Sequence, residues 1–141
     1  MMSRIATYQV RPIGRVHSAL RRLADAPRQG DEGAPDAWVR IDAEFVSGLD
    51  GIAAGQDLLL LTWLHQAQRD VLAVHPRGDA SRPLSGVFTT RSPDRPNPIG
   101  LHRVRVLAVE SDGALHVSGL EAIHGTPVLD LKPVLTDIPE R

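Results

Sequence analysis

Two arginines and three prolines are interleaved in residues 86–101, Gly-Val-Phe-Thr-Thr-Arg-Ser-Pro-Asp-Arg-Pro-Asn-Pro-Ile-Gly-Leu. Proline fixes its own φ and biases the preceding residue toward extended conformations, so this stretch predicts a stiff loop and not a helix. A stiff loop holds Arg91 and Arg95 at little further entropic cost, as recognition of an anion or a planar group requires. The alternative interpretation is a rigid surface crossover with solvated arginines.

Three further clusters combine polar side chains with a stiff or turning backbone. Pro27-Arg28-Gln29 lies in a long loop, where the alternative is simple solvation. His65-Gln66 directly follows an apolar run, a common place for ligands, although a strand-end histidine bonded to the backbone is the alternative. The Gly125-Thr126-Pro127 turn could present backbone groups to an adenine edge, or could be only a tight turn between two short strands.

Other familiar chemistries find no support in the sequence. The chain has no cysteine, which excludes disulfides, thiolate metal sites and a cysteine nucleophile. Its six histidines are scattered without a pair at metal-ligand spacing, so we expect no metal site. The glycines do not form a dinucleotide fingerprint, and there is no P-loop and no Gly-x-Ser-x-Gly elbow, so a Rossmann cofactor site is not expected.

Composition describes an ordinary globular chain. At 141 residues, with 42% hydrophobic and 23% charged residues, it predicts one domain with a real core. The net charge of −1 means that any RNA contact would come from a local patch. The N-terminus has no apolar segment, and the longest apolar run, Leu58–Leu64, is too short to span a bilayer. We therefore expect a soluble, cytoplasmic protein that does not bind membranes.

The elements that must position these residues are predicted to be strands. Tyr8–His17 is expected to open the fold, with an edge or bulge at Pro12. Trp38–Phe45 alternates apolar and polar residues beyond its first position, as a half-buried strand does. Leu58–His65 is almost entirely apolar and predicts a central strand buried on both faces.

Later segments complete a mainly β domain. Residues 103–110 and 115–118 alternate around Ser111-Asp112-Gly113, which predicts a β-hairpin through an Asp-Gly turn. Leu20–Asp36 is rich in Arg, Asp, Pro and Gly and predicts a long loop. Helix signals are poor throughout the chain. The sequence therefore predicts a single mainly β domain over residues 1–141, folded as a barrel or a strongly curled sheet.

Taken together, the clusters resemble the TsaA-like (TrmO) family over about Ile13 to Val134. The resemblance rests on Arg91–Leu101, Pro27-Arg28-Gln29, His65-Gln66 and the block Gly125–Pro133. It implies a compact, non-Rossmann, β-barrel-like fold with few short helices. It also implies an S-adenosylmethionine-dependent enzyme that methylates N6 of threonylcarbamoyladenosine beside the tRNA anticodon. The family further implies a homodimer with the cofactor close to the interface.

The family's residues carry over by motif. The implied cofactor-binding residues are Pro27, Arg28, Gln29, His65, Gln66, Arg95, Leu120, Ile123, His124, Gly125 and Thr126. The last five would cradle adenosine and methionine, and Arg95 would contact cofactor or substrate. His65 and His124 are candidate general bases because histidine titrates near neutrality. Arg91 or Arg95 is expected to pair with the threonyl carboxylate of the substrate.

The chain departs from the family pattern in three places. His124 stands where an aspartate is common, Gly51–Gly55 replaces a more aromatic segment, and the chain ends at Arg141 without the C-terminal domain of longer members. Two alternatives therefore stay open. One is a methyltransferase for another small or RNA substrate, and the other is an S-adenosylmethionine-binding protein without catalysis.

Overall fold

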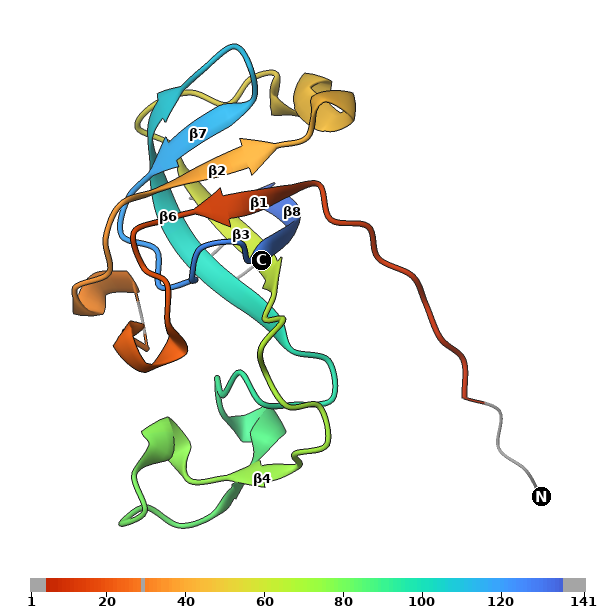
Figure 1. Cartoon of the computed structure of the whole chain (residues 1–141), viewed down its shortest axis with the longest axis vertical. Helices are drawn as coiled ribbons and strands as arrows, with labels where there is room; N and C mark the ends of the chain where they lie inside the picture. Colours follow the sequence, from red (N-terminus) through yellow and green to blue (C-terminus); the bar gives the residue numbers. More distant parts are fainter. Residues whose placement is uncertain (1–4, 29, 136–141) are drawn as a thin grey trace.

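The computed structural model describes residues 5–28 and 30–135 and is built around one antiparallel sheet (Figure 1). Its strands pair in the closed order β1-β2-β7-β6-β3-β8. Their bounds are β1 Gly14–His17, β2 Ala37–Ile41, β3 Asp57–Trp63, β6 Ile99–Val109, β7 Ala114–Val117 and β8 Pro127–Pro133. Two short strands, β4 Ala73–Val74 and β5 Ser85–Gly86, form a separate sheet. The prediction of a mainly β fold is confirmed.

Helical structure in the described residues is limited to short 3-10 segments. They are η1 Leu23–Asp25, η2 Gly30–Glu32, η3 Ala43–Leu49, η4 Pro76–Gly78 and η5 Val87–Thr89. Only η1 and η2 interrupt the predicted long loop between β1 and β2, so that prediction is confirmed. None of these helices is long and apolar enough to cross a membrane.

The predicted hairpin is confirmed as β6 and β7. Gly113 has a φ of 94°, a left-handed conformation that glycine adopts without a steric penalty. The Gly113 N–H donates to the Glu110 carbonyl and closes the turn. Strand β6 begins earlier than predicted, at Ile99, so the last residues of the arginine-proline stretch belong to the sheet.

Three strand predictions were partly wrong. The first strand starts at Gly14 and not at Tyr8, because Pro12 lacks the N–H that a ladder needs. The second ends at Ile41, where the Phe45 N–H donates to the Asp42 carbonyl and turns the chain into η3. The third, β3, is buried on one face only.

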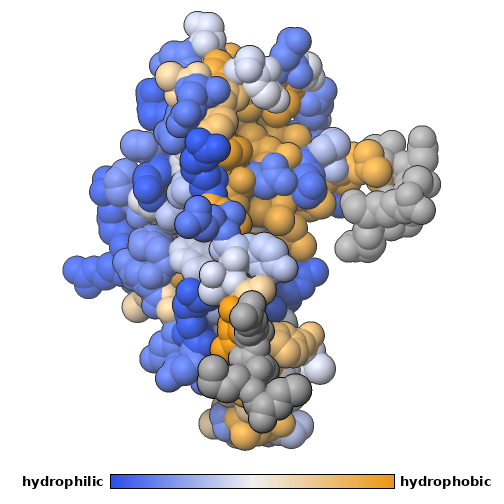
Figure 2. Space-filling view, turned by 90° about the vertical axis from the view of Figure 1, so that its right-hand side faces the viewer, coloured by the Kyte–Doolittle hydropathy of each residue, from blue (hydrophilic) through white to orange (hydrophobic). Residues whose placement is uncertain are grey.

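The outer face of β3 is apolar and partly exposed. Leu61 pairs with Leu101 of β6, and Trp63 pairs with Ile99, so four apolar side chains share this outer surface. Leu101 is 44% exposed and Ile99 45%. Apolar side chains also gather on the face of the molecule seen in Figure 2, beside more hydrophilic neighbours. We call Leu61, Trp63, Ile99 and Leu101 the outer apolar patch.

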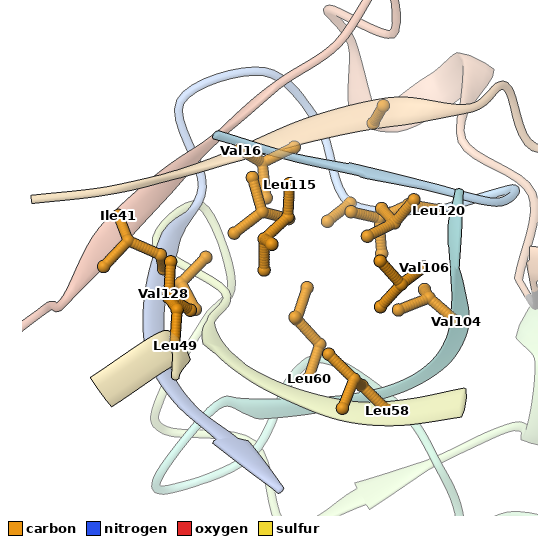
Figure 3. Packing of buried hydrophobic residues seen from close by; sticks show 14 residues of the cluster. Val16, Ile41, Leu49, Leu58, Leu60, Val104, Val106, Leu115, Leu120 and Val128 are labelled. Carbon is orange, nitrogen blue, oxygen red and sulfur yellow. The ribbon is translucent and has the colours of Figure 1, made fainter. Parts of the chain in front are cut away.

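The core fills the inside of the strand ring (Figure 3). Alternate residues of each strand point inward, as the two-residue period of a strand requires. The largest fully buried apolar side chains include Leu60 of β3, Leu115 of β7 and Leu120 of the following segment. This packing holds the ends of β3, β6 and the segment before β8 at fixed positions relative to each other.

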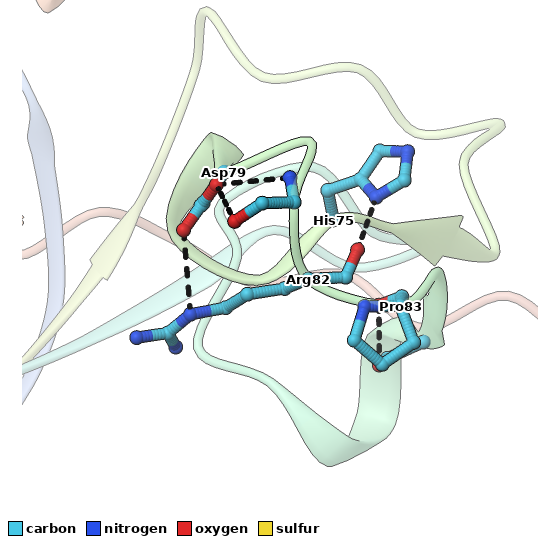
Figure 4. A network of polar contacts seen from close by, with 6 residues as sticks. His75, Asp79, Arg82 and Pro83 are labelled. Atoms are coloured by element: carbon cyan, nitrogen blue, oxygen red, sulfur yellow. Dashed lines mark hydrogen bonds and ion pairs between the residues drawn. The ribbon is translucent and has the colours of Figure 1, made fainter.

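The chain leaves the sheet between β3 and β6 and forms a separate lobe, residues 65–98 (Figure 1). A polar network stiffens the turn between β4 and β5 (Figure 4). There His75 Nδ1 lies 2.8 Å from the Arg82 carbonyl oxygen, and Asp79 forms an ion pair with Arg82. The Ser81 hydroxyl and N–H both donate to Asp79 and lower the pKa of its carboxyl group. The lobe carries the arginine-proline loop.

Candidate functional site

A cavity of about 810 Å³ lies between the lobe and one end of the strand ring. Its wall combines the loop before η2, the residues directly after β3, the rest of the lobe, the start of β6 and the segment before β8. This volume falls in the range typical of small-molecule sites, which are clefts with apolar walls and a few fixed polar groups.

Most of the residues predicted for the site line this cavity. They are Pro27, Arg28, His65, Gln66, Arg91, Arg95, Ile123 and Thr126. Leu120, His124 and Gly125 do not line it, and Gln29 lies outside the described residues. Predicted site residues as far apart in sequence as Pro27 and Thr126 therefore line the same cavity.

The Arg95 side chain stabilises its own loop through hydrogen bonds to backbone carbonyls. Its Nε donates to the Ser92 carbonyl at 2.7 Å, and one Nη donates to the carbonyls of Val87 at 2.7 Å and Thr90 at 2.5 Å. A guanidinium has five N–H donors, so these bonds leave it only partly available to a ligand. Arg91, by contrast, is exposed at the cavity wall. Of the two predicted arginines, Arg91 is therefore the better placed for an anion.

The Gly-Thr-Pro turn uses its backbone donors within the chain. The N–H groups of Gly125 and Thr126 donate to the carbonyls of Val16 and Ile123, and the His124 N–H donates to Leu20. The expectation that these N–H groups face a ligand was wrong, because the turn must close onto β1. Leu120 is likewise a core residue.

His124 has a structural partner outside the cavity. Its Nδ1 accepts the Ser18 N–H at 3.2 Å, which requires an unprotonated Nδ1. Burial lowers the pKa of His124, and the charges of Arg21 and His17 lower it further. The neutral ring thus acts as a backbone acceptor, a role that a carboxylate oxygen also serves. His124 therefore supplies a hydrogen-bond acceptor at the position where the resemblance predicts an aspartate.

The sequence analysis missed a buried polar chain beside the cavity. His102 of β6 is 5% exposed; its Nδ1 bonds Glu121 Oε1, and its Nε2 lies 2.7 Å from the Thr62 hydroxyl of β3. His102 and Glu121 line the cavity. One signal could have revealed the chain: Thr62 is the only polar residue within an apolar run whose inward positions are otherwise leucine.

Two glycines let the backbone approach this chain closely. A Cβ at Gly100 would lie 2.7 Å from His102 Nε2 and would also collide with Thr62. A Cβ at Gly30 would lie 2.5 Å from the Gly119 carbonyl oxygen and 3.2 Å from Glu121 Oε2. At both positions a Cβ would lie closer to a neighbouring atom than van der Waals contact allows, and of the two glycines Gly100 lines the cavity.

Contacts between the lobe and the loop before β2 close one side of the cavity. Arg77 forms an ion pair with Glu32 at 2.6 Å. The Arg28 guanidinium packs against Gly78, whose missing Cβ would lie 2.9 Å from Arg28 Nη2. Over residues 5–28 and 30–135, no group of three or more His, Cys, Asp or Glu side chains is arranged to hold a metal ion.

The chain is similar in sequence to proteins that are named for binding S-adenosyl-L-methionine. The chain is 42% identical over 130 residues to a probable S-adenosyl-L-methionine-binding protein of Methanothermobacter thermautotrophicus, covering 92% of each chain. It is 45% identical to a probable S-adenosyl-L-methionine-binding protein of Halobacterium salinarum, covering 88% of this chain and 96% of the relative.

Solved structures show the same fold. A crystal structure of TrmO superimposes with a TM-score of 0.77 at 34% identity, and one of TrmO from Pseudomonas aeruginosa with 0.75 at 31%. In both cases the match covers 96% of this chain but only 61% of the TrmO chain. Residues 15–139 match the tRNA-methyltransferase O N-terminal domain, and the chain belongs to that family.

Proposed function

We propose that this protein binds S-adenosylmethionine in the cavity and transfers its methyl group to N6 of threonylcarbamoyladenosine in tRNA. The observation that carries the proposal is that Arg28, His65-Gln66, Arg91 and Ile123 line the same cavity. The named S-adenosyl-L-methionine-binding relatives and the TrmO structures support the cofactor and the reaction class.

The lining suits the cofactor. Arg28 offers a guanidinium to a carboxylate, and His65 and Gln66 offer side-chain donors and acceptors at the end of β3. Ile123 and Ala122 supply apolar surface. Bound S-adenosylmethionine would supply an electrophilic methyl group on a sulfonium, while the protein aligns the acceptor nitrogen and excludes water.

Substrate recognition is assigned to the arginine-proline loop. Arg95 fixes the loop through three carbonyls, and this leaves Arg91 to pair with the threonyl carboxylate or a phosphate. The net charge of −1 gives no overall positive field that would attract RNA, so contact depends on local cations such as Arg91. We expect modest tRNA affinity that falls with salt, because few phosphates are neutralised.

The proposed assembly is a homodimer formed through the outer apolar patch. The exposed side chains Ile99 and Leu101 belong to this patch and also line the cavity. A second copy packed there would bury an apolar surface and place the partner close to the cofactor. The interface would then account for the apolar outer face of β3, which the monomer leaves partly exposed.

Nucleoside mass spectrometry tests the function. Protein, S-adenosylmethionine and tRNA carrying threonylcarbamoyladenosine should yield the N6-methylated nucleoside, and Arg91→Ala should reduce its formation. Arg103→Ala is the matched control, because Arg103 is paired with Asp57 outside the cavity lining. Binding of the cofactor without any methylated nucleoside would refute the substrate and favour a binding protein, the role named for the relatives.

A further inference from the structure

The proposed methyl transfer releases a proton from the acceptor nitrogen. A side chain that lines the cavity must accept this proton. When the N6 nitrogen attacks the methyl carbon, the N–C bond forms, the C–S bond breaks with its electron pair going to sulfur, and the N–H proton leaves. His65 is exposed, and His124 is outside the cavity lining. Among the described residues, His102 and Glu121 form the one hydrogen-bonded histidine–carboxylate pair that lines the cavity.

Glu121 is the member of the pair that can reach a ligand. Its side chain is 15% exposed, whereas that of His102 is 5% exposed and has both ring nitrogens engaged. One carboxylate oxygen, Oε1, bonds the His102 ring. The other, Oε2, lies beside Gly30, the first residue of η2. Because Glu121 is the more exposed of the two side chains, it is the one that can accept a proton directly from a bound nitrogen.

Thr62 lets the ring hold either one or two protons. With a neutral ring, His102 Nδ1–H donates to Glu121 and Nε2 accepts the Thr62 O–H. With a charged ring, Nε2–H donates to the same hydroxyl oxygen, because a hydroxyl is both donor and acceptor. The ring and the hydroxyl remain hydrogen-bonded in both states, and the fully buried Thr62 hydroxyl changes from donor to acceptor.

We infer that Glu121 accepts the proton released from the acceptor nitrogen, with His102 and Thr62 as positioning residues that hold its carboxylate and share the added charge. This inference rests on the proposed methyl transfer. It assigns a role to three residues that the sequence analysis did not name as site residues.

The decisive comparison is wild type against Glu121→Gln, which keeps the size and an acceptor oxygen but cannot act as a base. In single turnovers with saturating S-adenosylmethionine and tRNA containing threonylcarbamoyladenosine, the variant should be slower by about 100-fold or more. Calorimetric affinity for S-adenosylmethionine should change by less than about threefold, since ground-state contacts remain. Glu110→Gln, an exposed carboxylate outside the cavity lining, should match wild type.

Proton NMR of the protein without cofactor tests the hydrogen bond between His102 and Glu121. The ring N–H of His102 that bonds Glu121 should resonate far downfield, and Glu121→Gln should shift or remove that signal. Thr62→Val should slow transfer, and Thr62→Ser, which restores a hydroxyl, should recover it. A merely structural role for Thr62 would instead make stability and rate fall together in both variants.

The outcomes separate the two proposals. Wild-type protein that binds the cofactor but never methylates this tRNA contradicts the proposed function, and the proton acceptor with it. Active wild type together with equally fast Glu121→Gln overturns the proton acceptor alone.

Discussion

His102 Nε2 lies 2.7 Å from Thr62 Oγ1, and the bond joins β6 to β3 inside the fold. The contact depends on Gly100, the strand partner of Thr62, because a Cβ there would lie 2.7 Å from the same nitrogen. Gly100 and His102 line the cavity, and Thr62 supports them from the core side.

Gly100→Ala should destabilise the protein by about 1–3 kcal/mol, since the added methyl group overpacks a buried site. Urea unfolding monitored by circular dichroism measures the change. Gly86→Ala is the matched control, because it has an ordinary φ of −61° and no neighbour within 4 Å of the added Cβ. Equal stability of the two variants would show that the packing around Thr62 is not as tight as described.

His124 should make stability depend on pH. Its pKa is lowered from the ordinary value of 6.5, so the folded protein binds this proton less readily than the unfolded chain. The stabilising contribution is therefore complete above 6.5 and declines as the pH falls below it. Unfolding free energies measured between about pH 5 and pH 8 should show this decline, and His124→Asn should flatten it. If the unfolding free energy of the variant falls with pH as steeply as that of the wild type, another group causes the acid sensitivity.

Arg95 and Arg91 should behave differently when replaced by alanine. Arg95→Ala removes three bonds to carbonyls, so residues 87–95 should exchange amide protons faster, with stability lower by about 1–3 kcal/mol. Arg91→Ala should leave stability nearly unchanged and weaken tRNA binding, with a shallower salt dependence. Filter binding at several salt concentrations checks the second expectation. The assignment of roles fails if Arg91→Ala unfolds the loop and Arg95→Ala does not.

Short-range patterns predicted much of the fold, and long-range contacts explain what they missed. The alternation around Gly113 predicted the β6–β7 hairpin, because a tight turn fixes the register locally. The apolar run of β3 did not reveal that the closed ring buries only its inner face. The His102 chain joins residues 40 and 19 positions apart, and no spacing rule connects them. The sequence did not distinguish the roles of Arg91 and Arg95. The difference arises because Arg95 alone of the two donates to carbonyls of its own loop.

Leu101→Glu should dissociate the proposed homodimer. Leu101 is 44% exposed, so the monomer should tolerate the charge, while a paired apolar surface should not. Light scattering at micromolar concentration measures the mass. Leu107→Glu changes a residue of the same strand with 40% exposure, outside the outer apolar patch, and should remain dimeric. A monomeric mass for the wild-type protein would contradict the assembly directly.

Calorimetric titration with S-adenosylmethionine tests the central claim most directly. Wild-type protein should give saturable heat with about one site per chain, and Arg28→Ala and Gln66→Ala should each weaken binding by about tenfold, the loss expected for one charged or buried hydrogen bond. Arg103→Ala, whose side chain pairs with Asp57, should bind as wild type does. Absence of saturable heat from well-folded wild-type protein, or undiminished affinity in both cavity variants, would contradict a cofactor site in this cavity.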